Sequence, residues 1–119
     1  SLKLETDDSR LRQVLINLLV NAVKFTKEGS VVLKLEKAND GTALFSVADT
    51  GCGIPKEKQK LIFERFEKLN EFVQGTGLGL SICRLIVTFV GGKIWIDGDY
   101  TRGARFCFTH PLKYKSTLL

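Results

Sequence analysis

The chain has 119 residues, of which 44% are apolar, 26% are charged and two are proline. This composition suits one globular domain and argues against both disorder and two ordinary domains. A formal net charge of +5 suits an anionic ligand but is modest for a dedicated nucleic-acid binder. The three cysteines are widely spaced, which argues against a zinc site or disulfide framework and favours a reducing compartment.

The first half of the chain predicts a helix followed by a hairpin. A helix is expected over residues 7–26, because capping residues at its start are followed by apolar residues at helical spacing. Strands are expected over 30–37 and 43–49, separated by an Asn-Asp-Gly turn that tolerates positive φ.

The second half predicts two helices and a closing hairpin. The helices are expected over 56–66 and 78–90, with a mobile polar loop over 68–75 between them. Strands over 93–100 and 104–111 form the second hairpin. No apolar stretch is long enough to span a bilayer. The element order α-β-β-α-α-β-β favours an α+β fold in which helices pack on one face of a largely antiparallel sheet.

A polar strip interrupts the apolar surface of the first helix. Asn17, Asn21 and Lys24 stand at i, i+4 and i+7, on the side opposite a broad apolar face with Val14 at its edge. Other apolar residues predict that the helix is buried around much of its circumference: Ile16, Val20 and Val23. Amide oxygens and an ammonium group suit a hydrated divalent cation and phosphates. A solvated helix face is the alternative interpretation.

Two glycine-rich segments add further candidate sites. Asp49-Thr-Gly-Cys-Gly-Ile54 follows a predicted strand, so a carboxylate there can accept a hydrogen bond from an exocyclic amine while the glycines allow a flat ligand to approach. A tight turn capped by the Asp side chain is the alternative. Gly75-Thr-Gly-Leu-Gly-Leu80 runs into a helix and offers backbone N–H groups to an anion. A flexible hinge is its alternative.

Together these segments resemble the catalytic and ATP-binding (HATPase_c) domain of two-component sensor histidine kinases, within the GHKL ATPase superfamily. The resemblance covers essentially the whole chain, with four boxes in order. They are similar to an N box (RLRQVLINLLVNAVKFT, 10–26), a G1 box (DTGCGI, 49–54), an F box (FERF, 63–66) and a G2 box (GTGLGLSI, 75–82).

The resemblance implies a two-layer α/β sandwich, with three helices on one face of a mixed, mostly antiparallel sheet. It implies that Asp49 binds the adenine amino group, with Gly51, Gly53 and Ile54 lining the base pocket. Asn21, with Asn17, would hold Mg²⁺, and Lys24 would reach the phosphates.

The resemblance also implies a phosphate cradle and a lid. Phe63 and Phe66 would anchor a lid over residues 67–74, whose Lys68 is a candidate γ-phosphate contact. The cradle would be formed by backbone and neighbouring groups of the G2 box: Gly75, Thr76, Gly77, Leu78, Gly79 and Leu80.

One position bears on the reaction. Hydrolytic members of the superfamily carry a Glu where this sequence has Asn17, and an amide cannot deprotonate water. We therefore expect Mg-ATP to donate its γ-phosphoryl group to a histidine, with Asn17, Asn21 and Lys24 as the catalytic residues. The family's acceptor lies in a separate domain, and the only histidine here, His110, is expected to have no catalytic role.

The implied context is a cytoplasmic domain spanning 1–119 of a longer, homodimeric protein. Its partners would be the histidine-bearing dimerisation domain and a response regulator, without nucleic acid or direct membrane contact. Two alternatives stay open: a non-catalytic nucleotide-binding regulatory module, and a serine-directed kinase resembling anti-sigma-factor kinases.

Overall fold

Three helices and four strands are present in the computed structural model, which describes residues 8–38, 41–59, 61–63 and 78–111. They follow one another as α1 (Asp8–Phe25), β1 (Val31–Lys37), β2 (Thr42–Asp49), α2 (Lys56–Gln59), α3 (Leu78–Phe89), β3 (Ile94–Ile96) and β4 (Arg105–Pro111). The predicted order of elements is confirmed. The expected loop over 68–75 lies outside the described residues.

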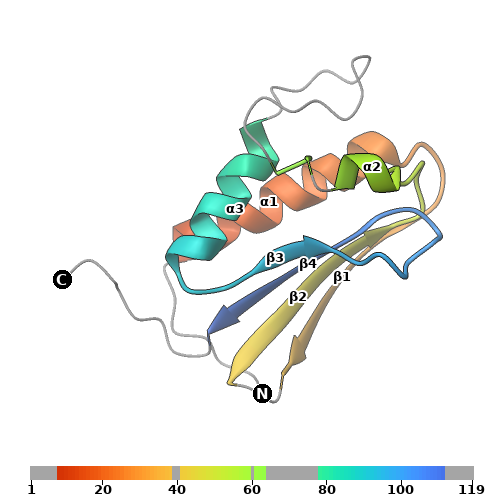
Figure 1. The fold of residues 1–119 in the computed structure, drawn as a ribbon. Helices are drawn as coiled ribbons and strands as arrows, with labels where there is room; N and C mark the ends of the chain where they lie inside the picture. Colours follow the sequence, from red (N-terminus) through yellow and green to blue (C-terminus); the bar gives the residue numbers. More distant parts are fainter. Residues whose placement is uncertain (1–7, 39–40, 60, 64–77, 112–119) are drawn as a thin grey trace.

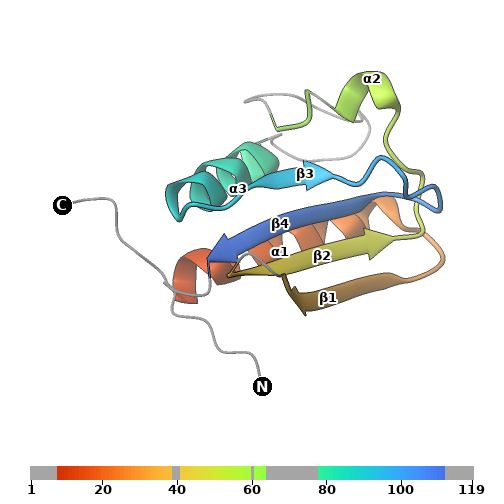
Figure 2. The same cartoon turned by 60° about the horizontal axis from the view of Figure 1, so that its bottom comes forward.

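The four strands form one sheet in the order β1-β2-β4-β3. All three strand pairs are antiparallel, and the register places Phe45 of β2 opposite Phe108 of β4. Helices α1 and α3 pack against each other and lie across one face of the sheet (Figures 1 and 2). The expected two-layer α+β architecture is confirmed.

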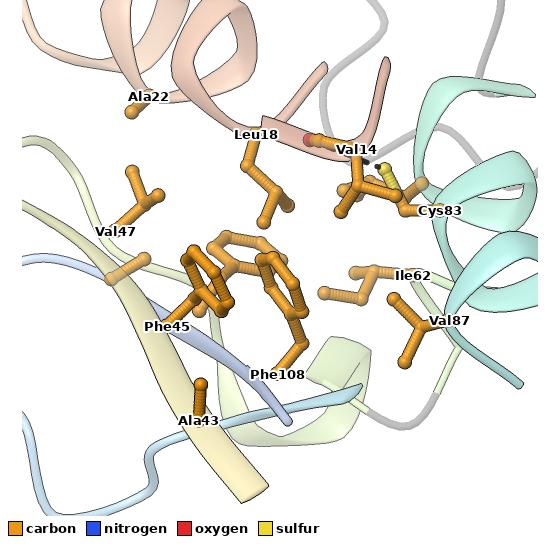
Figure 3. Packing of buried hydrophobic residues seen from close by; sticks show 13 residues of the cluster. Val14, Leu18, Ala22, Ala43, Phe45, Val47, Ile62, Cys83, Val87 and Phe108 are labelled. Carbon is orange, nitrogen blue, oxygen red and sulfur yellow. Dashed lines mark hydrogen bonds between the residues drawn. The ribbon is translucent and has the colours of Figure 1, made fainter. Parts of the chain in front are cut away.

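A hydrophobic core fills the space between the helices and the sheet (Figure 3). The rings of Phe45 and Phe108 stack with centroids 4.7 Å apart, beneath the buried side chain of Leu18. Cys83 and Val87 complete the core from α3. Burying each large side chain contributes about 1.5–3 kcal/mol, so this packing fixes α1 and α3 relative to the end of β2.

Helix α1 is less buried than its sequence predicts. Its buried residues Val14, Leu18 and Ala22 recur every four positions, so Val14 lies on the buried face and not at its edge. Ile16, Val20 and Val23 are 50%, 49% and 64% exposed, which makes the expected burial around the helix wrong. The reason is geometric, because among the described elements only the sheet and α3 cover this helix, from two sides.

Two other elements are shorter than expected. The predicted helix over 56–66 stops at Gln59, where Leu61 N donates to the Lys58 carbonyl at 3.0 Å and Ile62 turns into the core. The predicted strand over 93–100 ends at Ile96, because Asp97 forms a turn in which it accepts from the Asp99 amide at 3.0 Å. Within the described ranges, no helix combines the length and the apolarity needed to cross a membrane.

Candidate functional site

The site is built around Asp49, the last residue of β2. Its side chain points to the helix side of the sheet, like that of Val47, and the residue is only 2% exposed. Its Oδ1 accepts hydrogen bonds from Gly51 N at 2.9 Å and from Ala104 N at 3.1 Å. Among the described residues, none donates to Oδ2. One oxygen is therefore fixed by the backbone, while the other is left to accept from a ligand.

A narrow cleft of about 180 Å³ adjoins this carboxylate. Its walls come from α1, the loop after β2, and β4, and Asp49 is its only charged residue among those described. The other lining residues are Asn21, Phe25, Gly53, Ile54, Ala104 and Phe106. The cleft is too tight for a water-sized sphere, so a flat ligand enters only if its walls move apart. An apolar slot with one acceptor at its end suits a planar ring that carries an amino group.

A wider hollow adjoins the cleft at Phe25 and holds about 780 Å³ of empty space, open solvent included, against about 180 Å³ for the cleft. Lys24 and Lys27 contribute two cationic groups to its lining, and Glu28 contributes one anionic group. The remaining lining residues are Phe25, Thr50, Gly51 and Cys52. The two hollows share Phe25, so Lys24, which lines the wider hollow, lies on an adjoining part of the same surface as the apolar slot.

The loop after β2 is pressed against the end of α1. Cys52 N donates to the Phe25 carbonyl at 3.3 Å, and a methyl group on Gly51 would overlap that carbonyl. Only glycine therefore fits at position 51 while the loop keeps this position. The resulting contact brings the segments 10–26 and 49–54 together beside the cleft.

Asn17 connects α1 to the start of α3. Its Nδ2 donates to the Gly79 carbonyl at 3.3 Å. Cys83, on the same helix, donates from Sγ to the Val14 carbonyl of α1 at 3.8 Å, and its burial raises the pKa of the thiol to about 11, against the lowering effect of Asn17. The N-box and G2-box segments are thus in contact. The amide nitrogen of Asn17 is directed at α3. Its role as a metal ligand is not tested by this contact and stays a prediction.

The structure describes only part of the predicted phosphate cradle and lid. Leu78, Gly79 and Leu80 form the first turn of α3, with the Leu80 side chain in the core. Phe63 packs edge-to-face on Phe106 with centroids 6.0 Å apart, next to the cleft. The other predicted contacts lie outside the described residues: Lys68, Gly75, Thr76, Gly77, Phe66 and the lid over 67–74.

His110 is far from this cleft. It is buried opposite Ala43, at the end of β4 that lies about 20 Å along the strand from Ala104. Its Nδ1 is 2.7 Å from the Pro111 carbonyl oxygen.

Sequence reasoning missed the wall of the cleft that β4 and its preceding turn provide. Tyr100, Gly103, Ala104 and Phe106 all contact Asp49 or line its cleft. Phe25 was also missed, although it lies inside the N-box segment. The glycine at 103, just before a predicted strand, was the one local signal of a close backbone approach.

Comparison with known proteins identifies the family of this chain. The family described as histidine kinase-, DNA gyrase B-, and HSP90-like ATPase matches residues 6–114. The adaptive-response sensory kinase SasA of Gloeothece citriformis is 42% identical over 109 residues, which cover 89% of this chain and 28% of that protein. The circadian input-output histidine kinase CikA of Synechococcus elongatus is 44% identical over 110 residues, which cover 88% of this chain and 14% of that protein.

Solved structures share the fold. The nucleotide-free catalytic domain of histidine kinase ThkA superposes with a TM-score of 0.82 at 39% identity, covering 92% of this chain and 71% of that one. Full-length ShkA in complex with AMPPNP gives a TM-score of 0.79 at 40% identity, covering 96% of this chain and 24% of that one. This chain therefore belongs to the histidine kinase-, DNA gyrase B- and HSP90-like ATPase family, as an ATP-binding catalytic domain of the two-component sensor histidine kinase type.

Proposed function

We propose that the domain binds Mg-ATP with its base in the Asp49 cleft and donates the γ-phosphoryl group to a histidine on a separate dimerisation domain. The observation that carries the proposal is the buried Asp49 carboxylate, whose Oδ1 is held by two backbone amides while Oδ2 takes no donor from the described residues. The 6-amino group of adenine is a matching donor. The complex of the related ShkA with AMPPNP supports this assignment.

The described residues also fit a magnesium ion bound together with the phosphates. Asn21 lines the cleft beside Asp49 and offers an uncharged amide oxygen. Mg²⁺ typically takes one or two protein oxygens, substrate phosphates and several waters. When bound, the ion neutralises charge that builds up on the transferred phosphoryl group. Lys24 would add a positive charge on the same side of α1.

The residues at the cleft favour transfer to a protein acceptor over hydrolysis. The described part of the cleft contains no carboxylate besides Asp49, which is held by backbone amides, and the adjoining hollow has one, on the exposed residue Glu28 after α1. The amide at position 17 has no useful basicity. His110 lies at the far end of β4, so the acceptor must come from outside this domain. Positioning of the two reactants then supplies most of the catalysis.

The wider context is likewise a proposal. The chain spans less than a third of SasA and CikA, so their other domains have no counterpart in these 119 residues. We place a histidine-bearing dimerisation domain and a response regulator as the partners of this domain, on the cytoplasmic side of the cell, in a homodimeric parent protein.

Replacing Asp49 with Asn tests the base-binding role. Asn keeps an Oδ1 that accepts from Gly51 and Ala104 but substitutes an NH₂ donor for the free oxygen. Calorimetry with AMPPNP should show an affinity loss of about tenfold or more, since a donor now faces the adenine amino group. Asp99→Asn makes the same change in charge at an exposed turn and is the control. Unchanged affinity in Asp49→Asn would refute the assignment.

Phosphotransfer requires a second assay. Incubation with γ-labelled ATP and a dimerisation domain supplied in trans should give an acid-labile, base-stable phosphohistidine, and the domain alone should give none. Nucleotide binding without transfer, even from the full-length protein, would favour a regulatory module instead. An acid-stable phosphoserine on a partner protein would favour a serine-directed kinase.

A further inference from the structure

The last backbone pair between β2 and β4 is broken at Asp49. The register pairs Ala48 with Arg105, so Asp49 should exchange two backbone hydrogen bonds with Ala104. One of them is present, because Asp49 N donates to the Ala104 carbonyl at 2.8 Å. The other is diverted, because Ala104 N donates to the Asp49 side chain, at 3.1 Å from Oδ1, and not to its backbone carbonyl.

Tyr100 replaces the missing donor. Its hydroxyl donates to the Asp49 carbonyl at 2.8 Å, from the turn that joins β3 to β4. A buried backbone carbonyl without a partner is costly, so without this hydroxyl the Ala104 amide would be drawn back to the carbonyl. That return would remove one of the two bonds that orient the carboxylate.

The turn that carries Tyr100 is itself held in place. Asp97 accepts from the Asp99 amide at 3.0 Å and from Arg105 Nη1 at 2.7 Å, and Tyr100 N donates to the Asp97 carbonyl at 3.3 Å. The hydroxyl is therefore presented to Asp49 by a closed turn. Such preorganisation lowers the cost of keeping a side chain in one geometry.

We propose that Tyr100 is a positioning residue for base recognition: by satisfying the Asp49 carbonyl, it leaves the Ala104 amide free to orient the Asp49 carboxylate. This inference rests on the proposed function, in which that carboxylate binds the amino group of adenine. Tyr100 itself is not placed against the ligand, so its effect should be specific to the base.

Tyr100→Phe removes only the hydroxyl. By calorimetry we expect its affinity for ATP to fall about three- to tenfold, in line with the loss of one hydrogen bond, while its affinity for ITP, whose base carries oxygen in place of the amino group, changes little. A merely structural role would weaken both nucleotides equally. Thr101→Val removes an exposed hydroxyl from the same turn and should leave the ATP-to-ITP affinity ratio at the wild-type value.

Two NMR measurements complement the calorimetry. In amide NMR spectra, Tyr100→Phe should move the Ala104 signal, because this amide changes from a carboxylate to a carbonyl acceptor. If the variant does not fold, the exchange rate of the Tyr100 hydroxyl proton in the wild type is the second test. ATP should slow this exchange, because binding of the base favours the arrangement in which the hydroxyl donates to the Asp49 carbonyl. An unchanged ATP-to-ITP ratio in folded Tyr100→Phe, or hydroxyl exchange that ATP does not slow, would overturn the inference. Failure of the wild type to bind ATP, or normal binding by Asp49→Asn, would instead refute the proposed function.

Discussion

Gly103 lies against Asp49 so closely that a methyl group on its α-carbon would overlap the Asp49 carbonyl oxygen and stand 2.7 Å from Oδ1. The same methyl group would lie 2.8 Å from Gly51 N, the second amide that holds the carboxylate. These neighbours are backbone and a fixed carboxylate, so they cannot move aside without opening the site. The absence of a side chain at position 103 is therefore a requirement of the Asp49 geometry.

The first prediction follows from this contact. Gly103→Ala should destabilise the domain by about 1–3 kcal/mol, the usual cost of overpacking, and should reduce affinity for AMPPNP about tenfold. Gly98→Ala is a matched control in the same turn, because its added methyl group would meet no heavy atom within 4 Å. Urea unfolding and calorimetry on both variants check this. Equal free energies of unfolding and equal AMPPNP affinities in the two variants would contradict the proposed role of Gly103.

A second prediction concerns the link between α1 and α3. Asn17→Ala removes the donor to the Gly79 carbonyl and should lower the free energy of unfolding by about 1 kcal/mol. Asn17→Asp should lower the free energy of unfolding further, because a carboxylate oxygen would then face the Gly79 carbonyl. Gln13→Ala, at an exposed position of the same helix, is the control for thermal and urea unfolding. If Asn17→Ala instead keeps full stability and loses only the effect of Mg²⁺ on nucleotide affinity, a metal-binding role is favoured.

A third prediction addresses Asn21. Asn21→Ala should reduce the gain in AMPPNP affinity that Mg²⁺ provides by about tenfold, because one oxygen ligand is lost. Affinity measured in EDTA should change much less, since Asp49 and the cleft around it are retained. For each variant, the quantity to measure is the ratio of AMPPNP affinities with and without Mg²⁺, and the ratio for Asn21→Ala is compared with the ratio for Gln13→Ala. An unchanged ratio would exclude Asn21 as a metal ligand.

The sequence was most informative where a signal is local. Helical spacing placed Asn17, Asn21 and Lys24 on α1, and the carboxylate followed by glycines placed Asp49 at a strand end. The burial of the apolar side chains of α1 was harder to predict. Exposure of Ile16 and Val20 depends on which sides of α1 are covered, and that is a property of the assembled layers.

The rest of the site depends on pairing between distant strands. Tyr100 meets Asp49 only because β4 lies between β2 and β3 and because the register brings Ala104 beside Asp49. A shift of one residue would turn every side chain of β4 to the other face of the sheet. No spacing along the chain encodes that choice, so the broken pair and its tyrosine partner could be found only in three dimensions.

The fourth prediction concerns stability at alkaline pH. Burial raises the pKa of Cys83 from 9.0 to about 11, so the folded state holds its proton more tightly than the unfolded state does. The resulting contribution is complete below pH 9 and is lost as the pH rises towards 11, up to about 2–3 kcal/mol. Burial also raises the pKa of Cys107, so the pH dependence of the wild type alone is not diagnostic of Cys83. The difference in unfolding free energy between wild type and Cys83→Ala isolates the effect. It should narrow between pH 9 and 11, whereas parallel curves would show that Cys83 does not titrate as its burial requires.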